Sequence, residues 1–312
     1  MRYFLISAAA ILGAALLLLL ATGLILLKIF YAARRRDKNE PEFSLPEGKV
    51  YEPHHAQMIR WIKEIRAMER RDVSITSFDG LTLRGKYYEY KKGAPTEIMF
   101  HGYRGTAERD LCGGVHRCFC IGHNALIVDQ RSAGESEGRV ITFGTKESRD
   151  CLSWIDFMIQ HIDKDARIIL TGISMGAATV MMAAKHPLPP NVIGVLSDCG
   201  YTSTKAIIQK VIRDMKLPPK LLYPLVRLGA RIFGGFDPDA ESPIEAMKAC
   251  KLPIIFFHGD TDDFVPCSMS EENYAACAAE KKELVIIHGA GHGLCFPVDM
   301  EGYLSMLKGF FP

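Results

Sequence analysis

Short apolar segments separated by helical stretches recur along the chain from residue 97 onward. The apolar segments are 97–100, 125–128, 167–171, 192–196, 253–257 and 283–287, and the helical stretches fall near 105–119, 146–162, 175–185, 269–280 and 298–309. Strand, helix and strand in this order predict a mostly parallel sheet with right-handed crossovers. Because the strand segments are apolar throughout rather than alternating, helices should cover both faces of the sheet. The sequence therefore predicts an α/β fold.

Two regions depart from this alternation. Segments 73–78 and 82–90 are strand-like and joined by Asp79-Gly80, which predicts an antiparallel hairpin. Residues 201–250 follow a strand but contain helical segments, 204–215 and 220–233, and we interpret them as a lid. In the second segment apolar residues recur at helical spacing: Leu221, Leu222, Leu225, Leu228 and Ile232. This face should either line and cover a pocket or pack on the helices of the sheet.

The first thirty residues form a separate unit. Residues 4–27 carry no charge, and as a helix they would extend about 36 Å, against a hydrocarbon core of about 30 Å. A cleaved signal peptide is the alternative, but the run is long for one and its basic cluster follows it. We therefore predict a single-pass anchor in the cell membrane. Cations lie just after the run, at Lys28, Arg34, Arg35, Arg36 and Lys38, so the positive-inside rule predicts a cytoplasmic domain.

These features predict three parts: an anchor with its basic flank at 1–36, a linker and juxtamembrane helix at 37–72, and an α/β domain at 73–312 with the lid at 201–250. The helix near 54–70 should either lie on the membrane surface or, as we prefer, pack on the domain. The net charge of +2 gives no reason to expect a nucleic-acid partner. None of the nine cysteines has zinc-site or CxxC spacing, which favours reduced thiols and agrees with a cytoplasmic domain.

A nucleophile motif, Gly172-Ile173-Ser174-Met175-Gly176, lies between the strand at 167–171 and the helix that follows it. A serine on a sharp strand-to-helix turn needs small neighbours where the backbone comes close. The amino end of the helix then faces a developing oxyanion. In this setting Ser174 is the predicted nucleophile.

Two later loops supply a base and an acid. His292, flanked by glycines after the last strand, is the predicted base. Three carboxylates, Asp260, Asp262 and Asp263, follow the strand at 253–257, and one of them should orient the base.

The loop His101-Gly102-Tyr103-Arg104-Gly105 follows the strand at 97–100. The main-chain N–H groups of Tyr103 and Met175 should form an oxyanion hole. His101 itself is better interpreted as a histidine that braces this loop than as the base.

Residues 73–312 resemble the α/β-hydrolase superfamily, and within it the serine aminopeptidase S33-like and Bem46-like membrane hydrolases. The resemblance rests on the motifs above, on a D-Q-R-x-x-G-x-S-x-G segment at 129–138 and on H-G-x-x-D-x-x-V-P at 258–266. It implies that Asp262 is the acid. Some relatives carry the acid after an earlier strand, where Asp198 stands, so Asp198 is the reserve.

Together these residues predict a two-step acyl transfer that needs no metal and no organic cofactor. The expected substrate is a small carboxylic ester or a related acyl compound. The alternatives are peptidase or aminopeptidase activity, or a non-catalytic membrane-anchored binding protein on the same fold. The acyl chain length, the natural substrate and the oligomeric state stay open.

Overall fold

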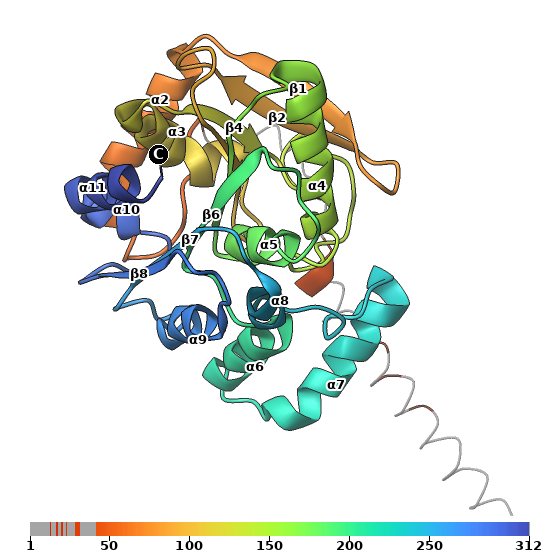
Figure 1. Cartoon of the computed structure of the whole chain (residues 1–312). Coiled ribbons are helices and arrows are strands. Elements are labelled where there is room, and N and C mark those ends of the chain that lie inside the picture. The colour runs from red at the N-terminus through yellow and green to blue at the C-terminus, as the bar shows by residue number, and fades with distance from the viewer. Residues whose placement is uncertain are drawn as a thin grey trace, which may run out of the picture.

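The computed structural model describes residues 42–311, together with Gly13, Leu17, Leu20, Gly23 and residues 29–31. An eight-stranded sheet runs through its centre in the order β1-β2-β4-β3-β5-β6-β7-β8 (Figure 1). The strands are β1 (Arg71–Thr76), β2 (Thr82–Tyr88), β3 (Thr96–Phe100), β4 (Asn124–Val128), β5 (Ile168–Ile173), β6 (Val192–Asp198), β7 (Ile254–Gly259) and β8 (Lys282–Ile287). β1 pairs antiparallel with β2, and β2 with β4, whereas the remaining pairs are parallel. The predicted mostly parallel sheet is confirmed.

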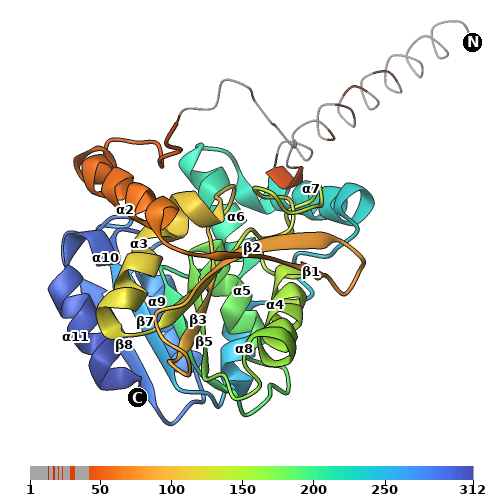
Figure 2. The same cartoon turned by 90° about the horizontal axis from the view of Figure 1, so that it is seen from above.

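Helices cover both faces of the sheet, as Figure 2 shows from above. They are α2 (His55–Ala67), α3 (Ala107–Ile121), α4 (Glu147–Phe157), α5 (Met175–Ala183), α6 (Thr204–Asp214), α7 (Pro219–Gly229), α8 (Pro243–Ala249), α9 (Ser268–Ala276), α10 (Cys295–Val298) and α11 (Met300–Phe310), with shorter turns η1 (Glu52–His54), η2 (Met158–Ile162) and η3 (Ala230–Gly234). One core cluster joins the sheet to α4, α5 and α8, and another joins it to α2, α3, α10 and α11. The sheet is thus buried on both sides, which explains its apolar strands.

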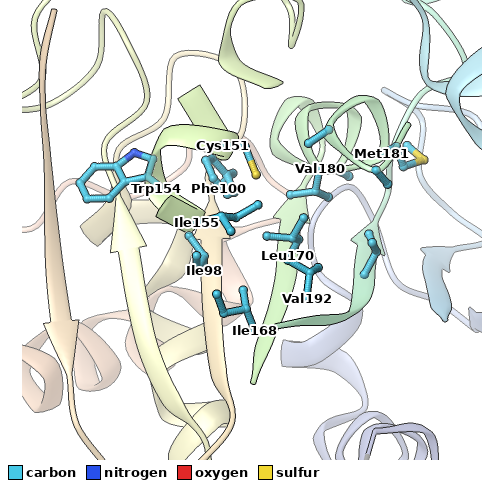
Figure 3. Packing of buried hydrophobic residues seen from close by; sticks show 14 of the residues in the cluster. Ile98, Phe100, Cys151, Trp154, Ile155, Ile168, Leu170, Val180, Met181 and Val192 are labelled. Carbon is cyan, nitrogen blue, oxygen red and sulfur yellow. The ribbon is translucent and has the colours of Figure 1, made fainter. Parts of the chain in front are cut away.

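Figure 3 shows the first of these clusters from close by. Ile98 and Phe100 of β3 and Leu170 of β5 have at most 1% of their surface exposed, and they pack with Trp154 of α4 and Val180 of α5. Every second residue of these strands faces this layer, as the two-residue repeat of a strand requires. The core therefore fixes the register of the parallel strands, so their carboxyl ends lie together at one edge of the sheet.

Helix α2 packs on the domain rather than presenting its apolar face outward. Its residues Trp61, Ile62 and Ile65 are buried against α3. Gly113 of α3 permits this approach, because a Cβ there would lie 2.9 Å from the Trp61 ring. Of the two placements expected from the sequence, the packed one is observed.

The predicted anchor at residues 4–27 lies outside the described residues, apart from Gly13, Leu17, Leu20 and Gly23. Within the part of the chain that the structure describes, no helix combines the length and apolar character needed to cross a bilayer. Residues 29–31 are fixed to the domain. Phe30 is 4% exposed and packs edge-on against Phe143 and Phe236, with ring centroids 5.6 and 5.4 Å away. Tyr31 forms an antiparallel bridge with Val140.

The orientation of α7 differs from both sequence expectations. Four residues of the predicted apolar face are exposed: Leu221, Leu225, Leu228 and Ile232. The fifth, Leu222, is partly buried and packs on the neighbouring core cluster. The buried stripe is instead Tyr223, Val226 and Ala230. Apolar residues lie almost all around this helix, so periodicity alone could not select the inward face. Four of the five predicted residues are therefore exposed, and none of the five lines the pocket that contains Ser174 and His292.

Candidate active site

Ser174 lies at the turn between β5 and α5 in a strained backbone conformation, with φ 56° and ψ −114°. The two glycines of the motif make this turn possible. A Cβ on Gly172 would lie 2.1 Å from the carbonyl oxygen of Gly176, and one on Gly176 would lie 1.9 Å from that of Phe100. The small residues are therefore required by backbone contact, as the sequence motif predicted.

His292 connects Ser174 to Asp262. Its Nε2 lies 2.9 Å from Ser174 Oγ, and its Nδ1 lies 2.7 Å from Asp262 Oδ2. The three side chains come from loops after β5, β7 and β8, at the carboxyl ends of parallel strands. Gly259 allows the last two loops to approach, because a Cβ there would lie 2.0 Å from the carbonyl oxygen of Ala290.

Asp262 is held as a buried carboxylate. Its Oδ1 accepts hydrogen bonds from the main-chain N–H groups of Phe264 and Val265 at 2.9 and 2.8 Å, and His258 Nε2 lies 3.3 Å from its Oδ2. Burial alone would raise the pKa of Asp262, but hydrogen bonds from His258, His292 and Val265 outweigh it and lower this pKa below its usual range. The side chain therefore stays ionised opposite His292. Sequence reasoning had given His258 no role of its own.

The other candidate carboxylates have different partners. Asp260 lies 2.8 Å from His288 Nδ1 near the surface. Asp263 lines the pocket beside Ser174, but His292 Nδ1 is hydrogen-bonded to Asp262 instead. Asp198, the reserve acid, is buried and accepts a 3.0 Å hydrogen bond from the Tyr303 hydroxyl. The geometry brings only Asp262 of the four to His292 within the described residues.

The predicted oxyanion-hole residues border the serine. A Cβ on Gly102 would lie 3.5 Å from Ser174 Cβ, and Tyr103, the next residue, lines the same pocket as Ser174 and His292. Met175 is the first residue of α5. The first N–H groups of a helix have no acceptor within it, so they are available to an anion. Both residues thus lie beside Ser174, Tyr103 in its loop and Met175 in the first turn of α5.

His101 braces its loop, in agreement with the sequence interpretation. It is buried, its Nδ1 donates to the carbonyl oxygen of Gly102 at 2.8 Å, and its Nε2 accepts from the N–H of Gln130 at 3.0 Å. Gln130 in turn accepts a 3.1 Å hydrogen bond from Thr179 of α5. Both ring nitrogens of His101 are therefore occupied, so of the two histidines only His292 remains a candidate base.

A pocket of about 420 Å³ opens at Ser174 and His292. One of its walls comes from a segment that sequence reasoning had treated as a linker, with Pro46, Glu47, Val50 and Tyr51. Val50 Cγ2 lies 2.6 Å from where a Cβ on Gly291 would be. The apolar residues of this segment could have indicated that it packs on the domain. Nothing in the local sequence, however, indicates that they pack against loops more than 200 residues away.

Tyr51 lies in the electrostatic field of the site. Burial raises the pKa of its phenol well above the usual value, and the neighbouring Cys199, Asp262 and Asp110 raise it further. The hydroxyl is therefore neutral, and it adds a mostly apolar ring to the pocket wall.

Cys199 lies close enough to Asp262 and His292 to suggest a metal site, with a ligand atom from each residue within 4.8 Å of the others. Burial raises the pKa of the Cys199 thiol well above its usual value, and Asp198 and Asp262 raise it further. Metals bind the thiolate, so a protonated thiol is a poor ligand. Because Asp262 and His292 are bonded to each other, the arrangement fits proton transfer better than metal binding.

Solved structures with the same fold include that of an esterase. The Pyrococcus furiosus esterase Pf2001 superposes with a TM-score of 0.66 at 23% identity, covering 79% of this chain and 92% of that one. Est1E from Butyrivibrio proteoclasticus, solved with ferulic acid bound, gives a TM-score of 0.57 at 21% identity over 76% of this chain and 97% of its own. The architecture is the α/β-hydrolase fold.

Sequence comparison finds relatives that match most of the chain. The chain is 25% identical to the protein bem46 of Schizosaccharomyces pombe over 252 residues, 78% of this chain and 77% of that one. It is 23% identical to the uncharacterised protein YqkD of Bacillus subtilis over 244 residues, 78% and 79% of the two chains. No family model matches the chain. The chain therefore has the α/β-hydrolase fold and is similar in sequence to bem46 over most of both chains. The likeness to serine aminopeptidases stays a prediction.

Proposed function

We propose that this chain is a serine hydrolase that cleaves a carboxylic ester or a related acyl compound through an acyl-enzyme on Ser174. The observation that carries the proposal is the continuous hydrogen-bonded series of Ser174, His292 and Asp262. A binding protein on the same fold would not need a base and an oriented acid directed at a serine. The series therefore favours catalysis over binding alone.

The mechanism has two steps. Ser174 Oγ attacks the acyl carbonyl carbon while its proton passes to His292 Nε2, and the N–H groups of Tyr103 and Met175 stabilise the oxyanion. His292 then gives the proton to the departing alkoxide or thiolate, which leaves an acyl ester on Ser174. In the second step water attacks this ester, His292 takes a proton from the water, and the carboxylic acid leaves as Ser174 Oγ regains its proton. Asp262 holds the imidazole tautomer and stabilises the imidazolium.

The pocket and the relatives support an ester or thioester. Val50, Ile173 and Phe264 give the pocket an apolar lining, and its volume is in the range of small-molecule sites. The thiohydrolase aneE of Aspergillus aculeatus is 32% identical over 117 residues, which is 36% of each chain. Its name and that of the Pyrococcus esterase favour hydrolysis of an ester or thioester over that of a peptide.

The proposed enzyme is a cell-membrane protein with a cytoplasmic catalytic domain. This part rests on the uncharged run at 4–27 and on the cations that follow it. Residues 201–250, which contain α6, α7 and α8, form the proposed lid between β6 and β7.

Labelling with a fluorophosphonate probe tests the chemistry. The full chain should be labelled at Ser174, and both Ser174→Ala and His292→Gln should abolish labelling. Peptide mapping of the modified residue checks the site. Labelling that persists in either variant, or that falls on another serine, would contradict the mechanism.

The N-terminal wall of the pocket gives a prediction about substrate selectivity. Tyr51→Ala should raise kcat/KM for longer p-nitrophenyl esters relative to short ones by about tenfold, because removing the ring extends the acyl space by more than a methylene group. The kinetics of a graded ester series measure this ratio.

Tyr90→Ala is the matched control, because Tyr90 is 49% exposed at the end of β2 and does not line the pocket. A lower melting temperature of Tyr51→Ala with an unchanged chain-length profile would mean that Tyr51 only packs.

A further inference from the structure

Large apolar side chains are exposed along one side of α7 and η3. We define the α7 face by Leu221, Leu225, Leu228, Ile232 and Phe233, whose exposed fractions run from 36% to 68%. Met215 and Leu217, in the turn before α7, are also exposed. Single exposed apolar residues are ordinary, but a continuous patch of this kind marks a surface that contacts something else.

The rest of the helix fixes this face outward. Tyr223 and Val226 are buried in the cluster beneath α7, and the Tyr223 hydroxyl donates to Asp239. Arg227 forms two hydrogen bonds to Asp237 at 2.8 Å. Turning the helix to bury the α7 face would break these contacts and expose Tyr223 and Val226. The outward orientation is therefore built into the fold.

The α7 face lies next to the place where the apolar N-terminal run joins the domain. A Cβ on Gly23 would lie 3.8 Å from the ring of Phe233. Phe30 packs edge-on against Phe236, just after η3. Figure 2 accordingly shows α7 beside the red segment that contains residues 29–31. A membrane that held the run before residue 29 would thus meet the α7 face first.

The charges around the α7 face suit an anionic surface. Residues 210–239 contain six Lys or Arg and three Asp. Each of the acids has a polar partner: Asp214 pairs with Lys210 at 2.6 Å, Asp237 with Arg227, and Asp239 with Tyr223. Exposed cations precede and begin α7: Arg213 near the end of α6, Lys216 in the turn and Lys220 in the first turn of α7. Apolar side chains bordered by cations are the composition of helices that lie in the headgroup region of anionic bilayers.

We propose that the α7 face rests in the interfacial layer of a lipid bilayer, as a second membrane contact beside the N-terminal run. A second copy of the chain or the run itself could also cover an apolar face, but neither accounts for the cations. The N-terminal run before residue 29 and the α7 face would then both contact the bilayer, and these two contacts hold the domain against the membrane in one orientation. The proposal does not depend on hydrolysis, because the contact exists without substrate.

A tryptophan reporter tests this contact in the full chain. The chain has two tryptophans, Trp61 and Trp154, which are 5% and 0% exposed, so their emission provides a constant background. Leu228→Trp adds a reporter to the α7 face, and Ile232→Trp gives a second one should the first variant fold poorly. The protein is reconstituted into phosphatidylcholine–phosphatidylserine vesicles whose acyl chains are brominated near the glycerol. Tyr90→Trp, at an exposed position two residues after β2, is the matched control.

We expect the bromines to quench the added emission of Leu228→Trp several-fold more strongly than that of Tyr90→Trp. Equal and weak quenching in both variants would overturn the proposal. A blue-shifted but unquenched emission would also overturn it. If that emission depends on protein concentration, a second copy of the chain covers the α7 face; if it does not, residues 1–28 cover it. Co-flotation of the protein with the vesicles is measured separately, so a failure of the anchor is distinguished from a failure of the α7 contact.

Discussion

Ser174→Ala should lower ester turnover about 10⁶-fold and leave the fold intact. The serine hydroxyl is the predicted nucleophile, and no other described hydroxyl is hydrogen-bonded to His292. The fold should survive because Ser174 Oγ contributes to the reaction rather than to the core. Alanine can also occupy the strained turn that serine occupies, since the neighbouring glycines keep the backbone contacts open.

Steady-state kinetics on a p-nitrophenyl ester, with circular dichroism and thermal melting on the same preparations, measure both effects. Ser197→Ala is the matched control. Ser197 pairs with Gly172 across β6 and β5, and its buried hydroxyl has no hydrogen-bond partner among the residues that the structure describes. This variant should retain its turnover and lose little stability. Near-wild-type turnover by Ser174→Ala would contradict the mechanism.

Asp262→Asn should lower kcat about 10⁴-fold, whereas Asp260→Asn and Asp263→Asn should have small effects. An asparagine preserves the shape of Asp262 but can stabilise the wrong imidazole tautomer, and it cannot balance the imidazolium charge. Because the pKa of Asp262 is held below its usual range, acidification should affect other groups before it protonates this carboxylate.

The comparison is made by measuring kcat for all three variants under identical conditions, with Asp198→Asn as a fourth. Equal and small effects at Asp260, Asp262 and Asp263, with a large loss at Asp198, would move the acid to the end of β6.

The sheet and the reactive loops could be predicted because their signals are local. The buried strands are short apolar runs, and the turn at Ser174 requires glycines at fixed offsets for reasons of backbone contact. His292 and Asp262 follow strands whose carboxyl ends must meet at one edge of a parallel sheet. The choice of Asp262 among three neighbouring carboxylates came from the family resemblance. The structure supplies its physical reason in the N–H groups of Phe264 and Val265.

The orientation of α7 and the origin of the pocket wall could not be predicted, because both depend on contacts between distant segments. Apolar residues surround α7, and the burial of Tyr223 is stabilised by Asp239, which lies beyond η3. Tyr51 approaches Asp262 only after the chain has folded. Its segment contains proline and charged residues, a composition that reads locally as a linker.

The attachment of residues 29–31 limits how the proposed anchor could be exchanged or removed. The Tyr103 hydroxyl donates to the carbonyl oxygen of Ile29 at 2.7 Å, and Arg104 donates to that of Tyr31 at 3.3 Å. A hybrid protein that joined a foreign leader at residue 37 would leave both side chains without these acceptors. It would also empty the space that Phe30 fills between Phe143 and Phe236. A loss of activity in such a hybrid would reflect damage to the loop at Tyr103 rather than the loss of membrane attachment. A deletion that tests membrane attachment alone therefore has to end before Ile29.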